Sequence, residues 1–172
     1  MKSKRILLSP PHMGGTELTY IAQAFQDNWI APAGPHIDLF ENRLVDFLDQ
    51  KSQVVALNSG TAAIHLGLQL LGVQKGDVVL CQSLTFIASV NPVLYLGAIP
   101  VFIGSEKETW NLCPIALEEA ILNQLNKGIQ PKAIVVVHLY GMPAKMNEII
   151  TISKKYNIPI LEDAAEALGS SY

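Results

Sequence analysis

Four short segments each follow a run of apolar residues, and their residue types could bind an anion or a planar ring. The first is Asn58-Ser59-Gly60-Thr61-Ala62-Ala63. If a helix begins there, its unpaired N–H groups and positive dipole end suit a phosphate. Gly60 would let the backbone approach the anion, and Ser59 and Thr61 would add hydroxyl donors. The alternative interpretation is a serine cap followed by a glycine turn.

The next two segments supply an aromatic ring and carboxylates. Phe86 lies within Ser83-Leu84-Thr85-Phe86-Ile87-Ala88-Ser89 and could stack on a planar ring, or it could be a core residue. Asp163 follows the apolar run 158–161, where a carboxylate could keep a pyridinium nitrogen protonated. Glu166 is near enough for the same site. The alternative for both acids is the first turn of a helix, where the dipole favours them.

The fourth segment, His138-Leu139-Tyr140-Gly141, follows the apolar run 134–137. A histidine at the end of a buried strand could line a ligand site. It could equally be a hydrogen-bonded residue of the core.

The elements that must position these segments alternate along the chain. Apolar runs predict strands at residues 53–57, 77–81, 99–103, 133–137 and 159–161. Helical spacing is found at residues 16–28, 37–49, 60–71, 86–96, 114–126 and 144–156, with Pro92 inside or bending the helix 86–96. This alternation predicts an α/β fold with an open, mostly parallel sheet and helices on both faces. Ligands of such sheets bind beyond the carboxyl ends of the strands, so the residues after 57, 81, 137 and 161 are the ones of interest.

Composition narrows the class of protein further. The chain has 172 residues, of which 49% are hydrophobic and 16% charged, which is enough for one sizeable core. A net charge of -3 with scattered Lys and Arg gives no basic surface for nucleic acid. No apolar stretch approaches the ~18 residues of a membrane span, so a soluble cytoplasmic protein is expected. Cys81 and Cys113 have no C-x-x-C spacing, which favours reduced buried thiols over a disulfide or a metal site.

Other common phosphate-binding and catalytic motifs are missing from the sequence. There is no G-x-G-x-x-G after a strand, no G-x-x-x-x-G-K-[ST], no H-E-x-x-H and no G-x-S-x-G. A nicotinamide enzyme or a nucleoside triphosphatase would therefore lack its usual phosphate site.

Taken together and in order, the segments resemble the DegT/StrS-type sugar aminotransferases, members of the aspartate-aminotransferase fold. The matching strings are Leu8-Ser9-Pro10-Pro11-His12-Met13-Gly14-Gly15, Asn28-Trp29-Ile30-Ala31-Pro32, Ser59-Gly60-Thr61-Ala62-Ala63, Ser83-Leu84-Thr85-Phe86-Ile87-Ala88, His138-Leu139-Tyr140-Gly141 and Glu162-Asp163-Ala164-Ala165-Glu166-Ala167-Leu168-Gly169. The first and last strings look like those of bacterial 4-aminotransferases that act on UDP-linked 4-keto-6-deoxy sugars.

The resemblance implies pyridoxal 5'-phosphate (PLP) as cofactor and gives roles to matching positions. Gly60 and Thr61 would bind the PLP phosphate, and Phe86 would stack on the pyridine ring. Asp163 would pair with the ring nitrogen and is the expected catalytic residue. Glu166 would lie beside the ring hydroxyl and the sugar.

The same resemblance implies a nucleotide-linked 4-keto-6-deoxy-sugar as substrate and an amino acid, glutamate, as amino donor. The expected substrate-binding residues are Ile30, Ala31 and Pro32, which would border the sugar pocket, together with Glu166 and His138. Sites of the family are built from two subunits, so a homodimer is expected.

The chain also departs from the family in its length. Family members are more than twice as long, and their Schiff-base lysine lies downstream in a segment resembling Ser-Phe-x-x-x-Lys. None of the ten lysines here stands in that context. Residues 1–172 are therefore expected to be the N-terminal part of a PLP-binding large domain, without the small C-terminal domain and inactive alone. Two alternatives remain: a truncated non-catalytic chain, or a PLP-type sugar dehydratase in which histidine replaces the lysine.

Overall fold

The computed structural model describes residues 5–7 and 10–172, so Leu8 and Ser9 of the first matching string lie outside the described residues. The chain divides into two compact units, one ending at Ala56 and the other running from Leu57 to Tyr172. In the described residues, no helix has the length and apolar character needed to cross a membrane.

The first unit contains two helices, α1 (Glu17–Gln26) and α2 (Pro35–Phe47), close to the predicted ranges. Proline suits the start of α2 because it has no N–H to leave unpaired. The predicted strand at residues 53–57 is wrong, because this segment is irregular. No strand pairs with it in the described residues, and the N–H of Ala56 donates instead to the Glu41 carboxylate at 2.7 Å.

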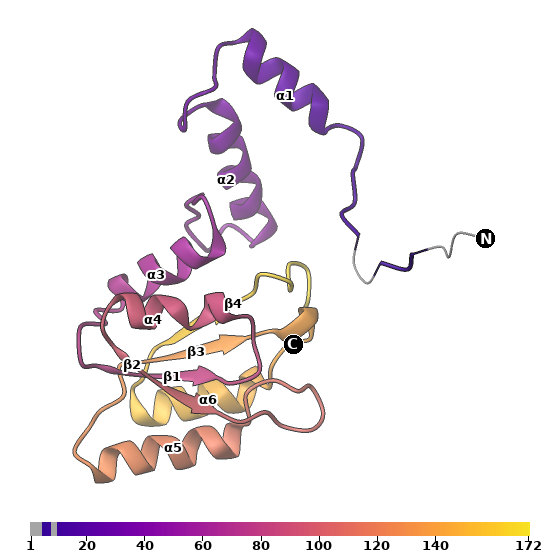
Figure 1. Cartoon of the computed structure of the whole chain (residues 1–172). Coiled ribbons are helices and arrows are strands. Elements are labelled where there is room, and N and C mark those ends of the chain that lie inside the picture. The colour runs from indigo at the N-terminus through magenta and orange to yellow at the C-terminus, as the bar shows by residue number, and fades with distance from the viewer. Residues whose placement is uncertain (1–4, 8–9) are drawn as a thin grey trace. The chain divides into compact units, whose positions relative to one another are not determined.

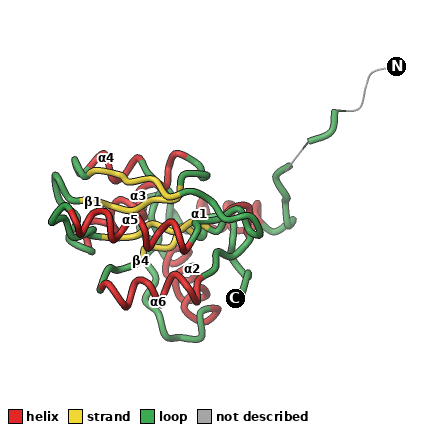
Figure 2. The backbone as a smooth tube through the Cα atoms, turned by 90° about the horizontal axis from the view of Figure 1, so that it is seen from below, coloured by secondary structure: helices red, strands yellow, loops and turns green. Residues whose placement is uncertain are grey.

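The second unit is built on a parallel sheet of four strands (Figures 1 and 2). These are β1 (Val78–Gln82), β2 (Ile99–Ile103), β3 (Ala133–Val137) and β4 (Ile160–Asp163), in the order β2-β1-β3-β4. Leu80 pairs with Val101 of β2 and Ile134 of β3, and Val135 pairs with Leu161 of β4. All four carboxyl ends therefore meet at one edge of the sheet.

Helices cover both faces of this sheet, which confirms the predicted fold class (Figure 1). Helices α3 (Gly60–Leu70) and α4 (Asn91–Tyr95) lie on one face, and α5 (Pro114–Asn126) and α6 (Met146–Tyr156) lie on the other. Alternate strand residues feed two cores: Val79, Cys81 and Val135 pack on the α3 and α4 side, whereas Leu80 and Ile134 pack on the α5 and α6 side. Strands β1 and β3 are buried at every residue, which explains their uninterrupted apolar runs.

The predicted helix at residues 86–96 is interrupted. A 3-10 turn, η1 (Ile87–Ser89), precedes the short helix α4, which begins at Asn91 with Pro92 in its first turn. Proline cannot donate the hydrogen bond that a helix interior requires, so the helix starts at the proline and does not run through it.

Both cysteines are free thiols, as expected, but only Cys81 is fully buried. Burial raises the pKa of the Cys81 thiol to about 12. The expectation of two buried thiols is wrong for Cys113, which is half-buried next to the first turn of α5.

A cavity at the carboxyl edge of the sheet

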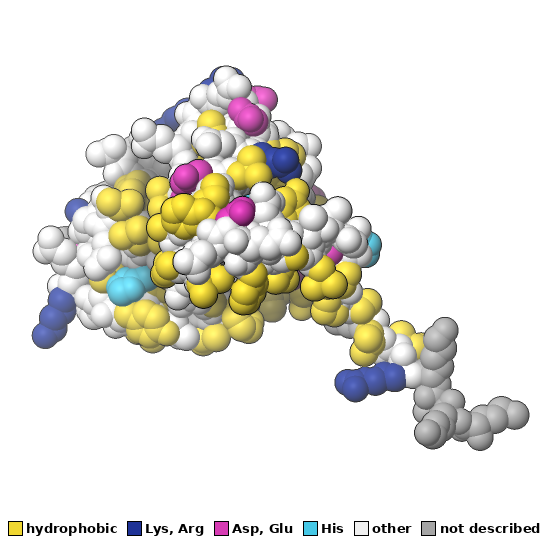
Figure 3. All heavy atoms as spheres, turned by 90° about the horizontal axis from the view of Figure 1, so that it is seen from above, with side chains coloured by type: hydrophobic (Ala, Val, Ile, Leu, Met, Phe, Trp, Pro, Cys, Tyr) yellow, Lys and Arg dark blue, Asp and Glu magenta, His cyan; other side chains and the backbone are white. Residues whose placement is uncertain are grey.

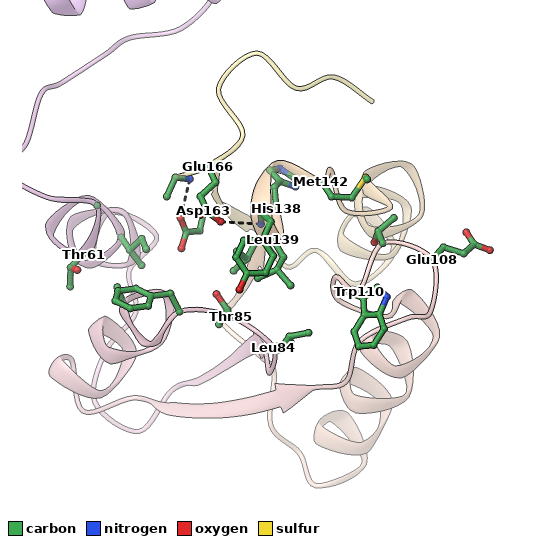
Figure 4. A pocket seen from close by; sticks show the side chains of 18 residues that line it. Thr61, Leu84, Thr85, Glu108, Trp110, His138, Leu139, Met142, Asp163 and Glu166 are labelled. Carbon is green, nitrogen blue, oxygen red and sulfur yellow. Dashed lines mark hydrogen bonds between the residues drawn. The ribbon is translucent and has the colours of Figure 1, made fainter. Parts of the chain in front are cut away.

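A cavity of about 990 Å³ opens at the carboxyl edge of the sheet and is lined by five segments of the second unit (Figure 4). Four of these segments follow residues 57, 81, 137 and 161, where the sequence predicted a ligand site. The fifth, residues 108–110, follows β2 and was not predicted. The lining residues with polar or aromatic side chains are Thr61, Thr85, Phe86, Glu108, Thr109, Trp110, His138, Tyr140, Asp163 and Glu166.

The N-terminus of α3 forms one wall of the cavity. Ser59 caps this helix, because its hydroxyl accepts a hydrogen bond from the Ala62 N–H at 3.2 Å, so the serine-cap interpretation is correct. The first N–H groups of a helix have no partner within it, and Gly60 and Thr61, the first two residues of α3, line the cavity. The space that a side chain at position 60 would occupy is empty. Ser59 can therefore cap the helix while the N–H groups of Gly60 and Thr61 remain available to bind an anion.

Phe86 projects into this space and is not a core residue. Its side chain is 77% exposed, although the residues that follow it are held in η1 and Ser89 is buried. Isolated exposed aromatics are common on protein surfaces, but this one lines a cavity. The core interpretation of Phe86 is wrong.

Asp163 is the last residue of β4, and no helix follows it in the described part of the chain. The interpretation of Asp163 and Glu166 as helix N-terminal acids is therefore wrong. One Asp163 oxygen, Oδ2, accepts from the Ser89 hydroxyl at 2.6 Å, and Oδ1 accepts from the Ala165 N–H at 3.3 Å. Asp163 and Gly60 line the same cavity at the carboxyl edge of the sheet.

His138 has both ring nitrogens engaged. Its Nδ1 accepts from the Ala144 N–H at 3.0 Å, and its Nε2 lies 3.1 Å from Oε2 of Glu162. An Nδ1 that accepts cannot carry the proton, so Nε2 donates to Glu162. His138 is only 5% exposed, so the hydrogen-bonded core interpretation is correct, although the residue also lines the cavity.

Glu166 connects the last segment of the chain to the turn after β3. Its Oε2 accepts from the Tyr140 N–H at 3.0 Å, and the Ser170 hydroxyl donates to the Gly141 carbonyl at 2.8 Å. Gly141 has φ +81°, and a Cβ at this position would lie 2.8 Å from the Glu166 carbonyl oxygen. A larger residue would therefore push these two segments apart.

Two buried amides that sequence reasoning missed hold three of the cavity loops together. Gln82 Nε2 donates to the Leu84 carbonyl at 2.9 Å and to Asn111 Oδ1 at 3.2 Å. Asn111 Nδ2 donates to the Met142 carbonyl at 2.8 Å, and its Oδ1 accepts from the Leu139 N–H at 2.8 Å. Both side chains are fully buried. The only sequence signal for them is their position at or soon after strands β1 and β2.

The unpredicted loop after β2 is organised by Glu106. Its carboxylate accepts from the Thr109 hydroxyl and from the N–H groups of Glu108 and Thr109, and Lys145 lies 3.3 Å away. These contacts, with the Thr109 hydroxyl first, lower the pKa of Glu106 to about 2. The loop presents Trp110, which is 63% exposed, with a left-handed backbone (φ 64°).

Charge in the cavity comes from carboxylates. Glu108, Asp163 and Glu166 line it, and among the residues that the structure describes no lysine or arginine lines it. The positive end of the α3 dipole and its free N–H groups are therefore the features that could attract an anion. In the described residues, no group of three potential metal ligands lies close enough to hold an ion.

Ile30, Ala31 and Pro32 belong to the first unit, between α1 and α2, and are exposed. Their predicted place beside a sugar stays a prediction.

The sequence model of the DegT/DnrJ/EryC1/StrS aminotransferase family matches residues 11–172, so this chain belongs to that family. The resemblance drawn from the motifs is thereby confirmed.

Relatives and solved structures agree with this assignment. The chain is 53% identical over 169 residues to EpsN of Bacillus subtilis (strain 168), described as a pyridoxal phosphate-dependent aminotransferase, covering 98% of this chain and 43% of that protein. It is 38% identical to GDP-perosamine synthase of Escherichia coli O157:H7, covering 98% and 44%. The PLP form of the sugar aminotransferase Spr1654 of Streptococcus pneumoniae superposes with a TM-score of 0.86 at 30% identity, covering 98% of this chain and 45% of that one. The chain thus spans less than half the length of the relatives it matches.

Proposed function

We propose that the whole protein transfers an amino group from an amino acid to a nucleotide-linked keto-sugar with PLP as cofactor. The described residues would form the first part of its PLP-binding large domain. One observation supports this most strongly: the α3 N-terminus, the exposed Phe86 ring and the Asp163 carboxylate line a single cavity. The solved structures in the family include a PLP form, which supports the choice of cofactor.

The residues present fit the three parts of PLP. The phosphate would bind the free N–H groups of Gly60 and Thr61 and the Thr61 hydroxyl. The pyridine ring would stack on Phe86, and its protonated nitrogen would donate to the Asp163 carboxylate. Bound PLP supplies an electron sink that stabilises negative charge developing on a substrate carbon. Asp163 contributes by holding a proton at the ring nitrogen, because its negative charge favours the pyridinium form.

The remaining predicted residues would act around the substrate. The second carboxylate oxygen of Glu166 would accept from the ring hydroxyl of PLP or from a sugar hydroxyl. His138 would line the sugar side and hold the segment at Ala144, since both its nitrogens are engaged within the protein. Ile30, Ala31 and Pro32 would border the sugar.

A lysine must come from elsewhere in the whole protein to anchor the cofactor, since none lines the cavity in the described residues. We further propose glutamate as donor and a 4-keto-6-deoxy-sugar as acceptor. The relative named GDP-perosamine synthase supports a nucleotide-linked sugar as substrate.

The direct test is to incubate the whole protein with PLP, glutamate and a UDP- or GDP-linked 4-keto-6-deoxy-sugar. Mass spectrometry should detect an amino sugar and 2-oxoglutarate in equal amounts. A dehydrated sugar without nitrogen would establish the dehydratase alternative and contradict the proposal, as would the absence of any product with both nucleotides.

A further inference from the structure

The Asp163 carboxylate accepts a hydrogen bond from the Ser89 hydroxyl, which in turn contacts the Thr85 hydroxyl, and the sequence motifs gave neither residue a role. We infer that Ser89, supported by Thr85, is a positioning residue that fixes the Asp163 carboxylate for the cofactor's ring nitrogen. This inference rests on the proposed function, because it needs a cofactor with a ring nitrogen in the cavity.

The contacts form a chain of three side chains. The Ser89 hydroxyl lies 2.6 Å from Oδ2 of Asp163, and Thr85 Oγ1 lies 2.8 Å from Ser89 Oγ. Residues 89 and 163 are far apart in the sequence but meet where η1 passes the end of β4. The short Ser89–Asp163 distance is typical of a hydroxyl that donates to a charged oxygen.

The direction of these hydrogen bonds follows from the number of protons. An ionised carboxylate can only accept, so the single hydroxyl proton of Ser89 points to Asp163. Ser89 can then only accept from Thr85, whose proton points to Ser89. The order is therefore Thr85 to Ser89 to Asp163, and each donor increases the polarity of the next.

Because Ser89 is buried, water cannot easily take the place of its hydroxyl group. Ser89 is 1% exposed, so a water molecule has no ready access to Oδ2 from that side. Removing the hydroxyl would leave Oδ2 without its short hydrogen bond. Only the longer contact from Ala165 to Oδ1 would then hold the carboxylate. The carboxylate would be free to turn away from the cavity.

The same short segment also carries the proposed stacking residue. Phe86 lies between Thr85 and Ser89, and the Ser89 N–H donates to the Phe86 carbonyl at 3.0 Å. Residues 85–89 therefore set both the ring that would lie against the pyridine face and the carboxylate at its nitrogen edge. A shift of this turn would move both contacts together.

The experiment compares apo and PLP-loaded forms of the whole protein carrying Ser89→Ala, Ser89→Thr, Thr85→Val or Ser83→Ala. Ser83 is the matched control, since it is exposed and does not line the cavity. The readouts are the PLP dissociation constant by fluorescence titration, the thermal midpoint of the apo form, and kcat and KM for the sugar. Hydrogen bonds to a charged group correspond to roughly tenfold to hundredfold in affinity. Ser89→Ala should weaken PLP binding by about tenfold or more and lower kcat, with little change in sugar KM.

The Ser89→Thr variant distinguishes a positioning role of the hydroxyl group from a packing role of the side chain. Ser89→Thr keeps the hydroxyl and should restore PLP affinity to within about threefold, while Thr85→Val should give a smaller loss than Ser89→Ala. Equal PLP affinity in Ser89→Ala and wild type would overturn the inference, and so would equal losses in Ser89→Ala and Ser89→Thr. If Ser89→Ala does not fold, Thr85→Val decides, and unchanged affinity in that variant counts against the inference. Failure of the wild-type protein to bind PLP would instead refute the proposed function.

Discussion

Asp163 and Phe86 line the same cavity, where Asp163 is half-buried and the Phe86 ring is exposed. The negative charge of Asp163 and the planar ring of Phe86 complement a protonated, planar heterocycle. Asp163 also joins η1 to the end of β4 through the Ser89 hydroxyl, whereas the Phe86 ring is exposed and lines the cavity. A ligand that contacts both side chains would account for their meeting at one cavity.

The charge of Asp163 is the first feature to test. In the whole protein, Asp163→Asn should lose most aminotransferase activity, because a neutral amide cannot favour the pyridinium form. The initial rate of amino-sugar formation at saturating PLP measures the effect. Near-normal turnover would show that another group performs this task.

Single residues could be predicted where the order of strands and helices sets their position, but not where their role depends on contacts between distant segments. The positions of Gly60, Thr61 and Asp163 at strand ends follow from the alternation of elements, and the structure places all three at the cavity. The engagement of both His138 nitrogens could not be predicted, because their partners, Ala144 and Glu162, come from different segments of the chain.

At the scale of elements, the side chains of Gln82 and Asn111 join the loops after β1, β2 and β3 through hydrogen bonds. Polar side chains with every hydrogen bond satisfied make a buried network rigid. The cavity wall formed by Leu84, Leu139 and Met142 therefore depends on residues that do not line it.

Asn111→Ala should destabilise the protein by about 3 kcal/mol, since it removes the hydrogen bonds that this buried amide makes with Gln82, the Leu139 N–H and the Met142 carbonyl. Urea unfolding followed by circular dichroism measures the change. Asn123→Ala, on the exposed side of α5, is the control and should change stability by less than about 0.5 kcal/mol. Equal stability of the two variants would mean that the buried network contributes little.

The loop after β2 should respond to acid through Glu106. Its pKa is lowered to about 2 from an ordinary value of 4.5, so the unfolded chain binds more protons than the native state between these values. The stabilisation is therefore complete above about pH 4.5 and is lost as the pH falls toward 2. Glu106→Gln should flatten the loss of thermal stability over this range, whereas Glu119→Gln, at an exposed site, should not. Parallel curves for wild type and Glu106→Gln would refute this assignment.

Four of the five predicted strands and most helix bounds follow from the sequence, because apolar runs and proline positions are local signals. The segment 53–57 has the same composition as a strand but lacks a neighbour in the described residues, and pairing is not a local property. The loop at residues 108–110 was missed although it follows a predicted strand. The rule that ligands bind at carboxyl ends, applied also to β2, would have included it.

At the scale of the whole molecule, much apolar surface is exposed. Helices α1 and α2 bury no residue, and Leu18, Ile21 and Phe25 of α1 form an exposed apolar stripe. Hydrophobic side chains are also prominent on the face shown in Figure 3. Apolar surface of this extent usually contacts another part of a protein or another copy.

We therefore expect the whole protein to form a dimer or a larger assembly. Sedimentation velocity over a range of concentrations should show a species of at least twice the chain mass. Ile21→Glu together with Phe25→Glu should weaken the assembly if α1 takes part in it. A monomer at working concentrations would refute the expectation.

We propose that the cavity of the whole protein holds PLP with its phosphate at α3 and its nitrogen at Asp163. A crystal structure of the whole protein with PLP tests it most directly. The predicted result places the phosphate at the N–H groups of Gly60 and Thr61, the pyridine ring against Phe86, and the ring nitrogen within hydrogen-bond distance of Asp163. A cofactor bound elsewhere, or bound in this cavity with its nitrogen away from Asp163, would contradict the account.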